Sequence, residues 1–225
     1  MIRKAEKEDN KKIAELHELL LGDSIFVRLG RPFLEGFYYS LLTEDKLAFA
    51  YVCEEDGKAV GFIAMAASHE SFYGQIKRRA LVLAWSLFKS VIMSPKTIGS
   101  ILQAISFILK KGDLIKCDAA GELLQIAVHP DYRAKGDDGK PTRFFDRTKM
   151  RVARGLYLSA TEELKRRGVK DFRIMTGDNN IASNGFYSKM GAKKAATGIM
   201  IFGHPTSIYR VNVEESLGIL HNSGI

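Results

Sequence analysis

Residues 122–136, ELLQIAVHPDYRAKG, decide how this chain folds. Their first half is an apolar run that ends at Pro130. Such a run is typical of a buried strand, because proline cannot donate a hydrogen bond to a β-ladder. Their second half places Arg133, Lys135 and Gly136 in one turn, where two cations and a flexible backbone suit a phosphate. A strand that passes through such a turn into a helix offers N–H groups to an anion. A buried strand followed by an ordinary solvated turn explains the same residues, so this stretch alone leaves both interpretations open.

Composition and charge narrow the classes of protein to consider. The 225 residues are 46% hydrophobic and 27% charged, values typical of a globular chain that can bury a sizeable core. The net charge of +8 favours anionic partners such as polyphosphate cofactors and disfavours polycationic substrates. Cys53 and Cys117 are the only cysteines, so we expect neither a disulfide framework nor a metal. Residues 1–12, MIRKAEKEDNKK, lack the apolar core of a secretory signal, and a cytoplasmic location is the expectation.

The part of the chain before the central stretch predicts a strand, two helices and a β-hairpin. Residues 2–5 suit a short strand, and Asp9 or Asn10 can cap a helix that ends near Gly22. Pro32 suits the first turn of a second helix. Residues 47–53 and 59–67 then form two apolar runs around the turn EEDGK, which indicates an antiparallel pair.

Residues 71–111 interrupt this pattern with two apolar segments. Residues 81–93 are apolar except for Ser86, Lys89 and Ser90, and apolar residues recur at helical spacing from 98 to 109. The sequence therefore predicts two amphipathic helices separated at Ser94-Pro95. Neither approaches the ~20 residues needed to cross a bilayer. Their apolar stripes are too wide to be left in water, so we expect a lid over a substrate or a homodimer contact, with membrane docking as a less favoured third possibility.

The part after the central stretch predicts a second parallel strand and a closing hairpin. A helix over residues 150–168 leads into a buried strand at 172–175, which would run parallel to the central strand if the helix is a crossover. Asn179 or Asn180 opens a further helix that Gly191 ends. Residues 196–202 and 208–213 are candidate strands around a glycine-containing turn.

This order of elements, together with three motifs, resembles the GNAT superfamily of acetyl-CoA-dependent N-acetyltransferases. ELLQIAVHPDYRAKG resembles the family's central strand and pyrophosphate loop, and RGLYLSATEELKRRG resembles the helix that follows. NIASNGFYSKMGA, residues 180–192, is similar to the family segment N-x-x-A-x-x-[FL]-Y-x-K-x-G-F. The resemblance implies a mixed α/β (α+β) fold in one acyltransferase domain, residues 1–225. Its sheet would be mostly antiparallel and flanked by helices, with the two-helix insertion at 71–111.

One departure from the family pattern lies in the pyrophosphate loop. The family runs [RQ]-x-x-G-x-[GA] straight into the helix, whereas here residues 137–150 intervene as an expanded loop. Two groups of residues could then bind the pyrophosphate, separately or together. The first group is Arg133, Ala134, Lys135 and Gly136, and the second lies near Arg154 and Gly155.

The resemblance also implies roles for individual residues. The pantetheine arm of acetyl-CoA would lie beside the backbone of Ile126, Ala127 and Val128, and the Val128 N–H would polarise the thioester carbonyl. Glu122 would act as the general base through a water, and Tyr187 would protonate the departing thiolate. Asn180 and Ser183 would contact the pantetheine, although capping of the helix explains Asn180 equally well.

Two classes of function remain after these observations. The first is acetyl transfer to a primary amine by direct attack in a ternary complex, with an amino sugar or another small amine favoured over a protein. The alternative is a catalytically inactive module that binds a partner or a membrane through residues 71–111. A nucleic-acid binder is disfavoured, because the cations are dispersed and are not interleaved with aromatic residues.

Overall fold

The computed structural model describes residues 1–22, 24–44, 48–114, 117–132 and 151–222 of the 225. A seven-stranded sheet in the order β1-β2-β3-β4-β5-β7-β6 organises them. The strands are β1 (Ile2–Lys4), β2 (Ala48–Glu55), β3 (Lys58–Ala66), β4 (Gly121–Val128), β5 (Asp171–Gly177), β6 (Lys193–Ile201) and β7 (His204–Asn212). Neighbouring strands are antiparallel except β4 and β5, which pair in parallel. The mostly antiparallel sheet that the sequence predicted is therefore confirmed.

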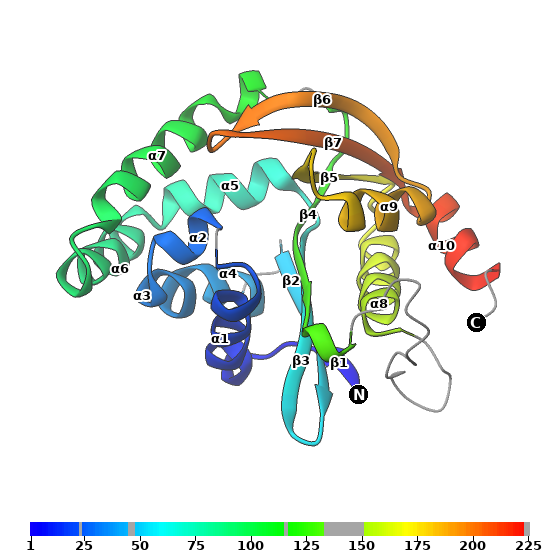
Figure 1. Ribbon diagram of the computed structural model, residues 1–225, viewed down its shortest axis with the longest axis horizontal. Helices are drawn as coiled ribbons and strands as arrows, with labels where there is room; N and C mark the ends of the chain where they lie inside the picture. Colours follow the sequence, from blue (N-terminus) through cyan, green and yellow to red (C-terminus); the bar gives the residue numbers. More distant parts are fainter. Residues whose placement is uncertain (23, 45–47, 115–116, 133–150, 223–225) are drawn as a thin grey trace.

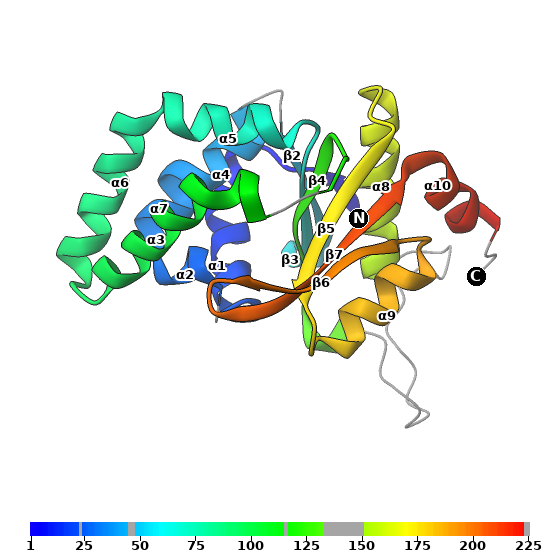
Figure 2. The same ribbon diagram turned by 90° about the horizontal axis from the view of Figure 1, so that it is seen from above.

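Helices cover both faces of the sheet (Figure 1). One face carries η1 (Lys7–Asp9), α1 (Asn10–Leu20), α2 (Ile25–Arg28), α3 (Arg31–Phe33), η2 (Leu34–Tyr38), α4 (Tyr39–Glu44), α5 (His69–Arg78), α6 (Ala80–Met93) and α7 (Thr97–Leu114). The other face carries α8 (Val152–Arg166), α9 (Ile181–Lys189) and α10 (Val213–Asn222). The short turn η3 (Pro130–Tyr132) follows β4. Figure 2 shows the sheet between these two helical layers, and each layer shares a separate apolar core with it.

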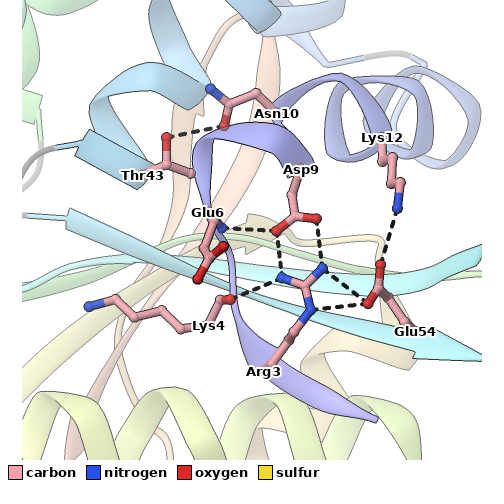
Figure 3. Close-up of polar contacts among 8 residues, drawn as sticks. All are labelled: Arg3, Lys4, Glu6, Asp9, Asn10, Lys12, Thr43 and Glu54. Atoms are coloured by element: carbon pink, nitrogen blue, oxygen red, sulfur yellow. Dashed lines mark hydrogen bonds and ion pairs between the residues drawn. The ribbon is translucent and has the colours of Figure 1, made fainter. Parts of the chain in front are cut away.

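A cluster of charged side chains fastens the N-terminus to the sheet (Figure 3). The Arg3 guanidinium donates to both carboxylate oxygens of Asp9, at 2.6 and 2.8 Å, and to Glu54 on β2 at 3.0 Å. The Glu6 amide also donates to Asp9, at 2.9 Å. Arg3 holds the pKa of the Asp9 carboxyl below its ordinary value. Asp9, which the sequence predicted as a possible helix cap, therefore ties β1 to the start of α1.

The central strand separates from its parallel neighbour halfway along its length. β4 pairs with β5 only from Gly121 to Leu123, although it continues to Val128. At the same point a β-bulge interrupts the pairing with β3, because Leu123 pairs with Met65 and Gln125 with Ala64. The extra residue in β4 is Leu124, and a bulge of this kind bends its strand. A gap therefore opens between the later halves of β4 and β5.

The segment after β3 differs from the sequence prediction in two ways. It contains three helices instead of two, because α5 starts at His69 and stays separate from α6; the break at Ser94-Pro95 is where it was expected. The second difference is the orientation of α6, whose buried residues are the serines Ser86 and Ser90. Helices α2 and α10 were also not predicted. The expanded loop at 137–150 lies outside the described residues.

Gly121 is a test of how closely β4 must approach its neighbours. A Cβ at this position would lie 2.9 Å from Phe172 Cβ and 3.3 Å from the Ala66 carbonyl. We expect Gly121→Val to lower the free energy of unfolding by about 1–3 kcal/mol, because neither rigid neighbour can move away cheaply. Gly185 is the matched control, since a Cβ there would meet nothing within 4 Å. Urea titration should show Gly185→Ala unchanged or more stable; equal loss in both variants would contradict the packing argument.

Candidate active site

A cavity of about 670 Å³ lies where β4 and β5 separate. Leu123, Leu124, Gln125 and Ile126 contribute its β4 wall, and residues 175–177 contribute its β5 wall. The start of α9 and the turn between β6 and β7 also reach it. The cavity therefore joins the gap in the sheet to the interior of the helical layer formed by α2 to α7.

The helical side of this cavity is aromatic and aliphatic. Its lining there includes Phe26, Phe33, Phe37, Tyr38, Phe72, Tyr73, Leu83, Leu87, Ile101 and Ala104. Several of these rings pack against one another, with centroids 4.7 Å apart for Phe26 and Tyr38. The Tyr38 hydroxyl is buried and has no hydrogen-bond partner among the described residues. A ligand in this compartment would meet apolar surface and a few polar groups.

Glu122 is the charged group at the inner end of the cavity. Its side chain is 1% exposed, and its Oε2 accepts hydrogen bonds from Arg173 on β5 at 2.7 and 3.0 Å. Its Oε1 accepts a hydrogen bond from the Tyr73 hydroxyl at 3.0 Å. The guanidinium of Arg173 is itself buried and stabilises the charged form of the carboxylate. Glu122 thus lies where a base was expected, and both of its carboxylate oxygens already accept hydrogen bonds from the protein.

Tyr187 reaches the cavity from the opposite side, on α9. It is 4% exposed and packs against Phe186 and Tyr209. Burial raises the pKa of its phenol above the ordinary value of about 10, so the hydroxyl keeps its proton. The group can therefore donate a proton into the cavity.

The start of α9 is fixed by side-chain hydrogen bonds to the backbone. Asn180 caps the helix, because its Oδ1 accepts the Ser183 amide at 3.1 Å, and both residues line the cavity. Asn184 donates to the carbonyls of Gly177 and Asn180, at 3.0 and 2.8 Å. Helix α9 is thereby attached to the end of β5, and Tyr187 is held at the edge of the gap.

The backbone N–H and C=O groups of successive β4 residues point alternately towards β3 and towards the gap between β4 and β5. The His129 amide donates to the Val60 carbonyl at 2.8 Å, so His129 and Ala127 direct their backbone groups towards β3. Ile126 and Val128 consequently direct theirs towards the gap. Of the three residues expected beside a pantetheine, these two face the gap, and only Ile126 lines the cavity.

The expected phosphate ligands are only partly described. Arg133, Ala134, Lys135 and Gly136 lie outside the described residues. The Gly155 amide donates to the Arg151 carbonyl at 2.9 Å, so it is already used inside α8. The Arg154 guanidinium donates to the Leu220 carbonyl near the end of α10. The amides of Val152 and Ala153 at the start of α8 are candidate anion ligands.

Several residues that shape the site were not identified from the sequence. Arg173 and Tyr73 are the main ones, and a charged residue inside a buried strand is a signal that could have pointed to Arg173. Behind β4, His17 Nδ1 lies 2.6 Å from the Tyr39 hydroxyl, which donates to Gln125 at 3.4 Å. Burial lowers the pKa of His17 to about 4, so it stays neutral. This chain of contacts supports the bulge from the side of the α1–α4 layer.

Comparison with known proteins identifies the fold. No model of a protein family matches the sequence, and no curated protein matches it. Among solved structures, the protein SsHAT is similar over 95% of this chain and 98% of its own, with 17% identity and a TM-score of 0.62. An N-acetyltransferase from Staphylococcus aureus Mu50 gives 95% and 98% coverage, 16% identity and a TM-score of 0.55. A ribosomal-protein-alanine N-acetyltransferase from Brucella melitensis gives 94% and 99%, 14% identity and a TM-score of 0.55.

These likenesses, together with the separated parallel strands, show that the chain has the GNAT fold. Among the residues that the structure describes, no helix combines the length and the apolar character that crossing a bilayer requires. In the same residues, no three His, Cys, Asp or Glu side chains gather as a metal site would need.

Proposed function

We propose that this protein transfers an acetyl group from acetyl-CoA to a primary amine that is attached to an apolar body. The observation that carries the proposal is the single cavity that joins the gap between β4 and β5 to the aromatic helical compartment. The gap suits an extended pantetheine arm, which can pair with the outward backbone groups of Ile126 and Val128. The thioester would then lie between Ile126 and Tyr187, facing the compartment.

The chemistry follows from the groups at that junction. The amine nitrogen attacks the thioester carbonyl carbon, and negative charge grows on the carbonyl oxygen. We assign its stabilisation to the Ile126 amide, because the cavity reaches Ile126 and stops short of Val128. As the carbon–sulfur bond breaks, Tyr187 gives its proton to the thiolate. The order is direct transfer within a ternary complex, with no acylated protein side chain.

The amine must lose a proton before or during this attack. Glu122, paired with Arg173, attracts the ammonium form of the acceptor, and a water held by the carboxylate relays the released proton to bulk solvent. The Tyr38 hydroxyl, buried and without a partner among the described residues, provides a second polar contact for the same nitrogen. Desolvation in the aromatic compartment also favours the neutral amine, which is the reactive form.

The pyrophosphate of acetyl-CoA is assigned to the loop of Arg133 to Gly136, with the first amides of α8 beside it. The positive charge of this segment is the support for this assignment. Titration calorimetry tests it, since acetyl-CoA affinity should fall as salt rises. A folded protein that binds no acetyl-CoA at low salt would contradict the proposed function as a whole.

The sequence left open an amino sugar or another small amine as the acceptor, and the apolar lining favours a hydrophobic amine over the sugar. A sugar would bury several hydroxyl groups against rings that cannot accept their hydrogen bonds. We expect kcat/KM for 2-phenylethylamine to exceed that for glucosamine by about 10²-fold, the effect of burying one phenyl ring. Thiol release from acetyl-CoA measures both. Preference for glucosamine would contradict the apolar acceptor while leaving acetyl transfer intact.

Ala104 offers a way to show that the helical compartment holds the acceptor. It lies on α7 and lines the cavity well away from β4. Ala104→Phe should raise KM for 2-phenylethylamine by about tenfold or more, because the added ring occupies the same volume. Acetyl-CoA affinity should not change. Unchanged KM would place the acceptor elsewhere.

A further inference from the structure

Helix α6 presents its largest apolar side chains to solvent. Leu81, Trp85, Phe88 and Ile92 follow one another at intervals of four, three and four residues, which places them on one helix face. Their side chains are between 54% and 87% exposed. The neighbouring residues Val82 and Met93 are exposed too. We call this surface, with Ile98 and Leu102 of α7, the outer face of α6 and α7.

The inner side of α6 carries small polar residues. Ser86 and Ser90 are 5% and 1% exposed. They lie against glycines, because a Cβ on Gly30 would stand 3.0 Å from Ser90 Oγ and one on Gly36 would stand 3.7 Å from Ser86 Oγ. The contact at Gly30 is tight and favours small residues on both sides, so larger side chains of α6 fit poorly at this position. The packing therefore favours an orientation of α6 in which its serines are buried and its aromatic residues face solvent.

The outer face continues onto α7 at the end of the molecule. Ile98 and Leu102 are 50% and 64% exposed, and α6 and α7 lie together at the end opposite α10 in both views (Figures 1 and 2). Trp85 and Phe88 stack with centroids 5.8 Å apart. The Nζ of Lys89 lies 5.1 Å from the Trp85 ring centre. An exposed surface of this size and composition calls for a covering partner.

Cations predominate in the helices that carry the outer face. Lys77, Arg78, Lys89 and Lys96 are exposed, and the acidic residues of α5 to α7 are Glu70 and Asp113, one near either end of the segment. Apolar and aromatic side chains bordered by cations, on a helix that cannot span a bilayer, are typical of helices that lie in a membrane interface. Cations near an anionic leaflet add an attraction for each charge.

We propose that the outer face of α6 and α7 docks this protein on an anionic lipid surface. The aromatic and aliphatic side chains enter the headgroup boundary, and the cations bind lipid phosphates. A second copy of the chain fits the face less well. A two-fold contact would bring Lys89 and its neighbouring cations against the same residues of the partner, with no acidic residue between positions 71 and 112 to neutralise them.

Docking in this orientation has a consequence for substrate access. Leu83 and Leu87 of α6 and Ile101 of α7 line the cavity from within, so these two helices separate it from the docked surface. The acceptor compartment would then lie beside the lipid, where apolar amines concentrate. The docking proposal does not depend on this consequence and can be tested without any turnover.

Trp85 is the only tryptophan in the chain, and its emission therefore reports on this face alone. With vesicles of phosphatidylcholine containing phosphatidylglycerol, we expect a blue shift and co-sedimentation of the full-length protein. Both should weaken as salt rises. Vesicles of phosphatidylcholine alone should bind the protein at least about tenfold more weakly, because they offer no anionic charge.

Two variants separate the apolar contribution of the outer face to lipid binding from its electrostatic contribution. Phe88→Ser should lower the vesicle partition coefficient about tenfold or more, as expected when one large apolar group no longer inserts. Lys96→Glu should lower it for anionic vesicles by a factor of several and leave neutral vesicles unaffected. Leu19→Ser is the control, since Leu19 is 68% exposed on α1, outside the face. It should bind vesicles as the wild type does.

Two results would overturn the proposal. The first is equal binding of the protein to neutral and anionic vesicles, or no blue shift with either. The second is a blue shift that grows with protein concentration in the absence of vesicles, accompanied by a doubled mass in light scattering, which would identify a second copy as the occupant. Calorimetry on the same samples should measure acetyl-CoA binding. If acetyl-CoA binds while the lipid test fails, the docking proposal is wrong and the proposed catalytic function is unaffected.

Discussion

Tyr187→Phe should lower kcat by about 10²–10⁴, the range expected when a general acid is removed. The affinity for acetyl-CoA should stay close to that of the wild type, because the ring and its contacts with Phe186 and Tyr209 remain. Stability should also stay unchanged. The substitution removes one oxygen atom, and the ring stays buried against the same neighbours. Steady-state kinetics, calorimetry and thermal unfolding measure the three quantities.

Tyr209→Phe is the matched control for this prediction. Tyr209 lies next to Tyr187, but its hydroxyl donates to Asn184 at 2.6 Å and the residue does not line the cavity. The control should lose some stability and keep its kcat. If instead Tyr187→Phe unfolds, or keeps full activity, the tyrosine is a core residue and another group or water protonates the thiolate.

The pH dependence of the wild type gives an independent check. Burial disfavours the phenolate and raises the pKa of Tyr187 above its ordinary value of about 10, so the acid form persists at every pH below that raised value. The rate should therefore rise with pH as the acceptor amine loses its proton and then level off. A fall in kcat below about pH 10 would mean that the acid has a lower pKa than a buried tyrosine.

The strands of the sheet and several of the helices were predictable because their signals are local. The apolar run that became β4 ends at a proline, and the EEDGK turn between β2 and β3 lies between two apolar segments. The motif around Asn180 and Tyr187 also placed α9 correctly, since its cap and its stop at Gly191 are short-range features. Gly191 has φ of +84°, which glycine adopts at no steric cost.

The orientation of α6 could not be predicted because it depends on residues distant in the sequence. Helical periodicity places Ser86 and Ser90 on one face of α6. A face that carries serines is ordinarily expected to point towards solvent. The decisive contact comes from Gly30, which lies so close to Ser90 that a small residue is favoured on the facing side of the helix. A single sequence gives no sign that these segments meet.

The partner of Glu122 was missed for a similar reason. The position of the carboxylate at the start of β4 follows from the motif, and the parallel pairing of β4 and β5 follows from the crossover. The register does not follow from either, and it is the register that places Arg173 directly beside Glu122. The hydrogen bond from Tyr73 to Glu122 depends in turn on α5, a helix that was not predicted as separate from α6.

This buried pair carries the second large expected effect. Arg173→Met would leave the Glu122 carboxylate inside the protein with its countercharge removed. We expect the free energy of unfolding to fall by about 3–5 kcal/mol, as when one partner of a buried ion pair is lost. Lowering the pH should recover part of this loss, because protonation of Glu122 removes the unpaired charge.

The double variant Glu122→Gln with Arg173→Met distinguishes this explanation from simple loss of packing. It carries no buried charge, and the new amide oxygen can still accept the Tyr73 hydroxyl that now donates at 3.0 Å. Urea unfolding followed by circular dichroism should show it clearly more stable than Arg173→Met alone, because the penalty of an unpaired ion has been removed from both sides. It should bind acetyl-CoA normally and transfer poorly, since Glu122 no longer attracts the acceptor amine. A double variant as unstable as the single one would mean that Arg173 stabilises the fold through its volume between β5 and α5, and that its charge has no part in holding Glu122 at the cavity.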